Sequence, residues 1–335
     1  MSEKKRVMSG MRPSNGLHLG PYLGVLKSWI ELQDDYDCYF SVADWHALTT
    51  GYEKSNQIRK NVLNVVFDWL ACGVNPDKAT IYVQSSIPEI AELSIYLNML
   101  TPKNWIERDA TIKSKINYFK NNKRQTSQIS FGLMSYPILM SADIMSINAH
   151  CVPVGAYHVP EVELTRNIVR KFNKIYDTNY FIEPKPLLGE YSLLCGVDGK
   201  KMGKSYNNAI NISDSEEITT KKIMQCITDR SRVKKDDKGH PNRCEVAFKY
   251  WQIFGSSDEI SQIEKECIAG ERGCADCKRM LAKKINSELS EIREKRKYFE
   301  NHVVEVEEIL NAGAEKARKI SKKVLEDVRN MIGMY

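Results

Sequence analysis

A strand-like segment near the N-terminus runs into a glycine-rich turn and then into a helical pattern, and this order constrains the fold more than any other feature. Residues 6–9 form the strand candidate, Gly10 to Gly20 form the turn, and Pro21 opens a stripe of apolar residues at helical spacing up to Ile30. Glycine lets the backbone approach a ligand closely, and a helix N-terminus offers N–H groups and a positive dipole. The arrangement predicts a nucleotide-binding turn.

Lysine side chains gather on a second glycine-containing loop past the middle of the chain. Its sequence is Lys201-Met202-Gly203-Lys204-Ser205. Ammonium groups on such a loop suit a polyphosphate whose negative charge grows as a bond to phosphorus breaks. Either motif alone is a weak signal, since most glycine-rich turns are only turns and most lysine pairs are only a solvated face. Together and in this order, the two motifs predict an ATP site.

The first half of the chain alternates strand-like and helix-like segments, which predicts an α/β fold with a doubly wound, Rossmann-like parallel sheet. The strand candidates are residues 6–9, 39–43, 80–84 and 149–154. Residues 55–72 carry an apolar stripe of helical period that is closed by Gly73, which predicts a helix. After Ser205 the strand signals fade, and a stripe from Val303 to Val328 predicts a mostly helical C-terminal domain.

The predicted organisation is a catalytic domain over residues 1–190 with a helical insertion near 100–130, a lysine loop over 191–210 and a helical domain over 211–335. The chain has 335 residues, of which 42% are hydrophobic, enough for one large core and a smaller one. Its net charge of +6 permits a polyanionic partner without demanding one. No apolar signal region opens the sequence and no apolar stretch is long enough to span a bilayer, so we expect a cytoplasmic protein without membrane contact.

The two motifs resemble the HIGH-type and KMSKS-type signatures of class I aminoacyl-tRNA synthetases, and the wider sequence resembles the tryptophanyl-tRNA synthetases. Further segments that resemble this family, in its order, are residues 44–49, 70–76, 136–144, 152–155 and 163–166. The resemblance implies ATP-dependent activation of L-tryptophan, with Mg²⁺, followed by transfer to tRNA(Trp). It also implies a homodimer formed through the insertion within residues 104–125, and tRNA binding by the helical domain.

Activation joins a carboxylate to the α-phosphorus of ATP, so alignment and charge stabilisation carry the reaction and no general base is needed. By resemblance, His18, Lys201 and Lys204 are the catalytic residues. His18 can donate to a phosphate oxygen, and the lysines can hold the departing pyrophosphate, with Mg²⁺ bridging its oxygens. The ATP-binding residues that the resemblance implies are Arg12, His18, Gly20, Pro21, Gly155, Lys201, Met202, Lys204 and Ser205.

The tryptophan side chain has one hydrogen-bond donor, its indole N–H, so we expect a hydrogen-bond acceptor in an apolar pocket to recognise it. Asp143 lies at a spacing that places it on one helix face with Met140, and by resemblance it is the family's indole-reading Asp. An isolated Asp more often caps or pairs within its helix, but its surrounding motif favours the functional interpretation. The tryptophan-binding residues expected in all are Met8, His46, Tyr136, Met140, Asp143, Ile144, Val152, Val154 and His158.

The chain departs from the family pattern at several positions. Pro21 stands where a His or Asn often ends the first signature, and Gly203 replaces the usual Ser of the second. Many relatives carry Gly-Glu-Asp-Gln where this chain has Gly155-Ala156-Tyr157-His158. Tyr157 cannot replace the ribose-facing carboxylate, whereas His158 can stand in for the amide that faces the amino acid.

Four cysteines in the helical domain have a spacing typical of metal ligands. They are Cys244, Cys267, Cys274 and Cys277, of which the last two form a Cys-x2-Cys pair. Zinc is the commoner occupant of four cysteines on spacing alone, and four unrelated thiols are the plain alternative. The spacing is similar to that of a bacterial subset of tryptophanyl-tRNA synthetases with a [4Fe-4S] cluster, which favours the cluster over Zn²⁺.

Three other functions are compatible with these motifs. A tyrosyl-tRNA synthetase shares the fold and an Asp in the comparable helix, although residues 44–49 and 152–155 look tryptophanyl. A small-molecule nucleotidyltransferase with a HIGH-like motif would not need the long helical domain. A non-catalytic RNA-binding or metal-sensing descendant would lack activity, and the retained His18, Lys201 and Lys204 count against it.

Overall fold

The chain forms two compact units. The computed structural model describes residues 4–108, 112–114, 116–117, 129–155, 158–189, 194–203 and 206–335. The first unit comprises Met1–Asn15, Val25–Glu190 and Asn301–Tyr335, and the second comprises Gly16–Gly24 and Tyr191–Glu300. These boundaries differ from the expected ones, because the last helix joins the first unit and part of the glycine-rich turn joins the second. Residues 109–111, 115 and 118–128 of the predicted insertion lie outside the described residues.

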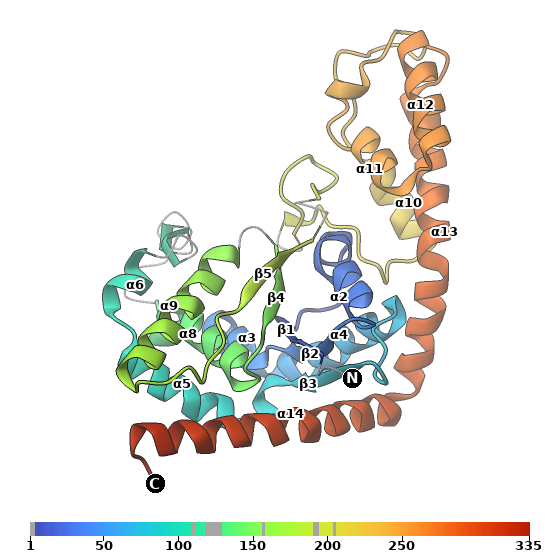
Figure 1. Cartoon of the computed structure of the whole chain (residues 1–335). Coiled ribbons are helices and arrows are strands. Elements are labelled where there is room, and N and C mark those ends of the chain that lie inside the picture. Colours follow the sequence, from blue (N-terminus) through green and yellow to red (C-terminus); the bar gives the residue numbers. More distant parts are fainter. Residues whose placement is uncertain are drawn as a thin grey trace. The chain divides into compact units, whose positions relative to one another are not determined.

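A five-stranded parallel sheet forms the centre of the first unit (Figure 1). Its strands are β1 (Arg6–Met11), β2 (Asp37–Val42), β3 (Ala79–Val83), β4 (Cys151–Val154) and β5 (Lys185–Leu188), in the order β3-β2-β1-β4-β5. The predicted α/β fold is confirmed, and the four strand candidates match β1 to β4 with shifted ends. The sequence analysis missed β5, because Pro184 and Pro186 argue against a strand and only an edge strand tolerates them.

Helices cover both faces of this sheet. They are α2 (Lys27–Leu32), α3 (Asp44–Gly51), α4 (Ile58–Cys72), α5 (Pro88–Leu100), α6 (Lys103–Arg108), α8 (Phe131–Ser146), α9 (Val159–Ile175) and α14 (Val303–Ile332). Short turns η1 (Tyr22–Leu26), η2 (Tyr52–Gln57) and η3 (Gln84–Ser86) link some of them. Successive residues of a strand point to opposite faces, so a parallel sheet buried on both sides reads as a nearly continuous apolar run.

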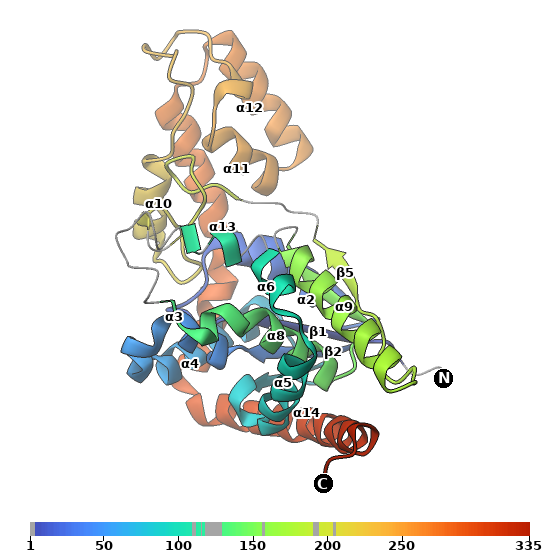
Figure 2. The ribbon, with the colours of Figure 1, turned by 90° about the vertical axis from the view of Figure 1, so that its left-hand side faces the viewer.

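Neighbouring residues of β2 show the two faces. Phe40 stacks on Trp29 of α2 with ring centroids 4.3 Å apart, and Trp29 meets Trp69 of α4 edge-on at 5.0 Å. Tyr39 points the other way, into an apolar cluster built largely from α5, α8, α9 and α14. Figure 2 shows α5, α8 and α9 side by side on this face. Asp143 is on α8, so the tryptophan site predicted from the sequence lies on this second face.

The C-terminal helix α14 packs against the edge strand β3. Its predicted apolar stripe is confirmed, with Val306, Leu310, Val324 and Val328 buried. The stripe was assigned to the helical domain, which is wrong for this helix, because its apolar face covers the sheet of the first unit. Gly313 makes this contact close, since a Cβ there would lie 1.8 Å from the carbonyl oxygen of Ile81.

The second unit is mainly helical. Besides α1 (Leu19–Pro21) it contains α10 (Glu216–Met224), the short turn η7 (Pro241–Arg243), α11 (Ala247–Phe254), α12 (Ser257–Ala269) and α13 (Cys274–Asn301). Ser215 caps α10, and Ser256 forms a capping box with Glu259 at the start of α12. In the part of the chain that the structure describes, no helix has both the length and the apolar character needed to cross a membrane.

Candidate functional site

Polar side chains follow the carboxyl ends of four adjacent strands in the first unit. Arg12 follows β1, His46 follows β2, Gln84 follows β3 and His158 follows β4. Ligands of open α/β sheets bind beyond this edge, because loops from parallel strands converge there. Three of these residues were candidates from sequence, and Gln84 was missed although its position directly after a strand is a usable signal.

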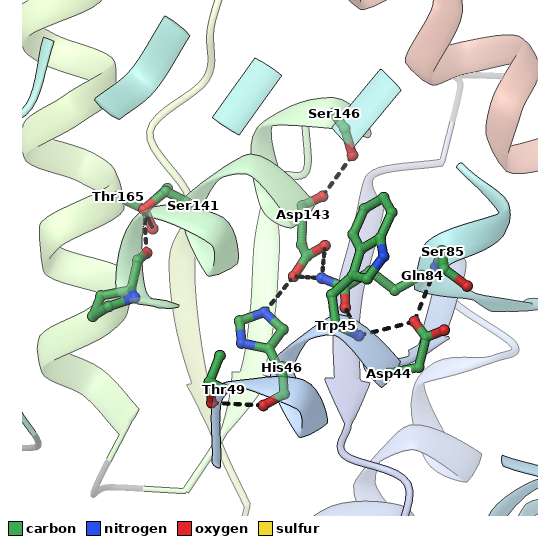
Figure 3. Close-up of polar contacts among 11 residues, drawn as sticks. Asp44, Trp45, His46, Thr49, Gln84, Ser85, Ser141, Asp143, Ser146 and Thr165 are labelled. Carbon is green, nitrogen blue, oxygen red and sulfur yellow. Dashed lines mark hydrogen bonds and ion pairs between the residues drawn. The ribbon is translucent and has the colours of Figure 1, made fainter. Parts of the chain in front are cut away.

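Asp143 is the centre of a buried hydrogen-bond network (Figure 3). Its carboxylate is 4% exposed and accepts from Gln84 Nε2 at 2.8 Å (Oδ1) and 2.9 Å (Oδ2). His46 Nε2 lies 2.9 Å from Oδ2. Gln84 is itself held, because its Oε1 accepts from the backbone N–H of Trp45 at 3.1 Å. The network fixes the direction in which the Asp143 carboxylate points.

The local sequence explains why α8 delivers Asp143 to this place. Ser130 caps the helix by accepting from the N–H of Leu133. Two residues before Asp143, Ser141 Oγ lies 2.9 Å from Thr165 Oγ1, which ties α8 to α9. Burial, and next the Asp143 charge, raise the pKa of the Tyr82 phenol above its usual range, so this neighbouring ring stays neutral.

Apolar residues surround the network, as expected for an indole site. Five candidates belong to one buried cluster and a sixth packs against it: Met8, Tyr136, Ile144, Val152, Val154 and Met140. The structure therefore brings the predicted apolar residues together.

A second polar group adjoins the first through Tyr136. The Tyr136 ring lies edge-on to His46, with centroids 6.1 Å apart. Its hydroxyl donates to Glu161 Oε1 at 3.0 Å, and His158 Nδ1 lies 3.5 Å from the same oxygen. Glu161 is fully buried, with 0% of its surface exposed. The sequence analysis did not single it out, because an acidic residue in the first turn of a helix is common.

Arg12 lies at the same edge of the first unit. Its Nη2 donates to Thr50 Oγ1 at 2.6 Å and to the Ala47 carbonyl at 3.4 Å. Burial lowers the pKa of the guanidinium, and the nearby Tyr136 opposes this shift. At Gly155 nothing would contact an added Cβ within 4 Å, so the protein itself does not demand glycine there.

In the second unit, the first signature pairs with the segment that follows the lysine loop. His18 and Asn211 form an antiparallel bridge, with Leu19 N–H donating to Ile210 O at 2.9 Å and Ile212 N–H donating to Leu17 O at 3.0 Å. His18 caps the short helix α1, which contains Pro21, by accepting from Gly20 N–H at Nδ1 (3.3 Å). Because Nδ1 accepts, Nε2 carries the proton in neutral His18. That tautomer suits donation to a phosphate oxygen.

The lysine loop is shaped by Asn208, which the sequence analysis missed. Its side chain donates to Lys201 O at 3.1 Å and to Asp198 Oδ1 at 2.7 Å, and it accepts from Gly203 N–H at 2.9 Å. Met202 is buried, and a Cβ on Gly20 would lie 4.0 Å from its Sδ. The two signatures are thus neighbours within this unit. Lys204 and Ser205, like Ala156 and Tyr157, lie outside the described residues.

The four candidate cysteines come from a loop, the end of α12 and the start of α13. Burial raises the pKa of Cys277 to about 11, with further contributions from Cys244, Cys267 and Cys274, so the four thiols are neighbours. Arg232 Nη1 is 3.9 Å from Cys267 Sγ. Across the residues described, however, no three Cys, His, Asp or Glu side chains lie as a ligand set for one metal ion. The donor chemistry fits a metal centre, and the arrangement is not closed around one.

Comparison with known proteins gives a consistent result. The family described as tRNA synthetases class I (W and Y) matches residues 1–290. The tryptophan–tRNA ligase of Thermotoga maritima is 38% identical, over 98% of this chain and 99% of that protein, and the ligase of Aquifex aeolicus is 36% identical over 98% and 100%. The crystal structure of Campylobacter jejuni tryptophanyl-tRNA synthetase with ADP and tryptophan superposes with a TM-score of 0.87 at 30% identity, covering 98% of this chain and 100% of that one. This chain therefore belongs to the tryptophanyl-tRNA synthetase family of class I.

Proposed function

We propose that this protein activates L-tryptophan with ATP and transfers it to tRNA(Trp). The observation that carries the proposal is the fixed, buried carboxylate of Asp143 among apolar side chains. A carboxylate accepts up to about four hydrogen bonds, so one indole N–H can join the contacts from Gln84 and His46. An aromatic side chain without a hydrogen-bond donor would leave the Asp143 carboxylate with one hydrogen bond fewer. This difference favours the binding of tryptophan over such a side chain.

ATP would be held by residues of both signatures. We assign Arg12, Gly155, His18, Gly20, Pro21 and Met202 to binding, together with the loop residues Lys201, Lys204 and Ser205. The Nε2 proton of His18 would reach a phosphate oxygen, and the lysines would neutralise the pyrophosphate as it leaves. Mg²⁺ supplies further charge stabilisation when bound with the nucleotide.

Tryptophan and tyrosine must be separated by experiment, because the matching family covers both. ATP–pyrophosphate exchange with each amino acid provides the test, and we expect faster exchange with tryptophan. Faster exchange with tyrosine would reverse the assignment. Exchange that needs neither amino acid would favour a small-molecule nucleotidyltransferase, and no exchange at all would favour a non-catalytic descendant.

We propose that Cys244, Cys267, Cys274 and Cys277 hold a [4Fe-4S] cluster. Bound there, the cluster would cross-link the loop before α11 to α12 and α13, which is a structural role. The proximity of the four thiols supports this. Arg232 supports it too, because its charge opposes the rise in the Cys267 pKa that burial causes, and so favours the thiolate. The ultraviolet–visible spectrum and iron content of anaerobically purified protein test it. A colourless protein with one zinc per chain would refute the cluster, and a protein without metal would refute any metal site.

The helical unit is proposed to bind tRNA through basic residues near the cysteines. Lys278 is also basic and lies beside the cysteines, but we do not assign it a contact with tRNA. Its ammonium donates to the carbonyls of Met224 and Cys226 at the end of α10, where it offsets the helix dipole. Arg279 and Lys283 line a cavity of about 430 Å³ between α10 and α13, and we assign phosphate contacts to these two.

We propose a homodimer whose interface includes, besides the insertion predicted within residues 104–125, an apolar face of the first unit. Large side chains are exposed on α3, η2, α5 and the start of α8: Leu48, Tyr52, Ile95, Met99 and Phe131. Phe131 is 91% exposed and borders a groove of about 360 Å³ lined by Trp45, Leu48 and Tyr52. A protruding ring beside a groove on one face suits a two-fold symmetric contact. Light scattering of Phe131→Asp, with Val304→Asp as an exposed apolar control, tests this face; a dimeric Phe131→Asp variant would refute it.

We also propose that the protein works in the cytoplasm.

A further inference from the structure

The pair formed by Tyr136 and Glu161 has no role in the chemistry considered so far. Glu161 lies in the first turn of α9, shortly after residues 155–158, and its side chain is fully buried. Burying a carboxylate is costly, and proteins retain such groups where a hydrogen bond or a charge compensates the cost. Glu161 lies beside the predicted tryptophan site, where its negative charge would attract a positively charged group of the substrate.

The hydrogen bond between these residues has a defined direction. The Tyr136 hydroxyl donates to Glu161 Oε1 at 3.0 Å. A phenol has one proton, so a hydroxyl that donates to Glu161 meets any other polar group as an acceptor. Glu161 thereby converts Tyr136 into an acceptor and places a negative charge directly behind it.

A chain of contacts links this acceptor to the indole-reading group. Asp143 Oδ2 lies 2.9 Å from His46 Nε2, the His46 ring meets the Tyr136 ring at 6.1 Å, and Tyr136 bonds Glu161. Tryptophan carries its indole N–H and its α-ammonium at opposite ends. A substrate whose indole N–H binds Asp143 would direct the ammonium toward the Tyr136 end of this line.

We propose that Glu161 is a positioning residue for the α-ammonium group of tryptophan, acting through the hydroxyl of Tyr136. By resemblance, His158 stands at the position of the amide that faces the amino acid in relatives, and its Nδ1 lies 3.5 Å from Glu161 Oε1. The Glu161 carboxylate supplies a negative charge, which neither an imidazole nor an amide carries. This inference rests on the proposed function.

Two substrate fragments separate this role from a purely structural one. Tryptamine keeps the ammonium group and lacks the carboxylate, and indole-3-propionate keeps the carboxylate and lacks the ammonium. Both are used as inhibitors of tryptophan-dependent ATP–pyrophosphate exchange by the full-length protein. Glu161→Gln retains an acceptor for Tyr136 and removes the charge, so we expect the inhibition constant of tryptamine to rise about 10- to 100-fold. That of indole-3-propionate should stay within about twofold of the wild-type value, and KM for tryptophan should rise more than kcat falls.

Glu163→Gln is the matched control, because Glu163 is on the same helix, near the surface, and pairs with Arg166. It should leave both inhibitors unchanged. Equal weakening of both inhibitors by Glu161→Gln, or no change in either, would overturn the proposal. Should Glu161→Gln fail to fold, Tyr136→Phe removes the acceptor itself and must show the same selective loss of tryptamine binding. Wild-type protein without tryptophan-dependent exchange would instead refute the proposed function.

Discussion

Replacing Gly313 by alanine tests how the C-terminal helix contributes to the catalytic unit. A methyl group at this position would lie 1.8 Å from the carbonyl oxygen of Ile81 and 2.7 Å from its carbon. An ordinary C···O contact is about 3.3 Å or longer, so α14 must move from β3 by about 1.5 Å. The obstacle is the backbone at the middle of the edge strand β3, which cannot rotate away as a side chain can.

The expected cost combines two opposing effects. Overpacking of this kind costs about 3 kcal/mol, because the displaced helix loses contacts along its buried stripe. Alanine in place of glycine inside a helix returns about 1 kcal/mol. We therefore expect Gly313→Ala to lower the free energy of unfolding of the first unit by about 2 kcal/mol.

Urea unfolding followed by tryptophan fluorescence measures this change. Four of the five tryptophans lie in the first unit: Trp29, Trp45, Trp69 and Trp105. Gly132→Ala in α8 is the control, since a Cβ there would meet no atom closer than 3.8 Å, and it should stabilise the unit slightly. If Gly313→Ala is as stable as the wild type while the control behaves as expected, the close packing of α14 on β3 does not exist in solution.

Three further predictions concern the sites. Asp143→Asn should raise KM for tryptophan about 10- to 100-fold in the exchange assay, because it removes a charged acceptor, and an unchanged KM would contradict the assigned role. Lys204→Ala should slow adenylate formation about 100-fold while tryptophan affinity, measured by equilibrium dialysis, changes little; Lys200→Ala is its control, and equal losses in both quantities would argue against contact with the leaving group. Hydrogen bonds from Ser231, and next from His240, hold the pKa of Asp229 below its usual range, so its stabilising effect is complete above the unfolded pKa of about 3.9 and is lost as the pH falls. The stability difference between wild type and Asp229→Asn in urea should therefore shrink from pH 7 to pH 3, and a constant difference would show that this carboxylate is not depressed in the folded state.

Local patterns in the sequence determined much of the architecture. The four predicted strands and the C-terminal helical stripe follow from the spacing of apolar residues, which depends on neighbours a few positions away. The glycine-rich turn and the lysine loop were recognisable for the same reason, since each motif is contiguous. Strand β5 was not predicted, because Pro184 directly before it and Pro186 within it are tolerated only at a sheet edge, and its edge position is a property of the assembled sheet.

Only the tertiary structure decided which polar groups meet. Asp143 was identified from its own motif, but its partners Gln84 and His46 are 59 and 97 positions away in sequence, and no local pattern predicts that pairing. The same holds for Glu161, whose contact with Tyr136 joins two helices. An amphipathic stripe predicts that a helix such as α14 buries one face. The surface against which that face packs depends on whether the two shapes fit, and α14 fits against β3 because Gly313 has no side chain. Sequence fixes what each segment must bury or satisfy, whereas the partner is selected by packing among segments that are distant along the chain.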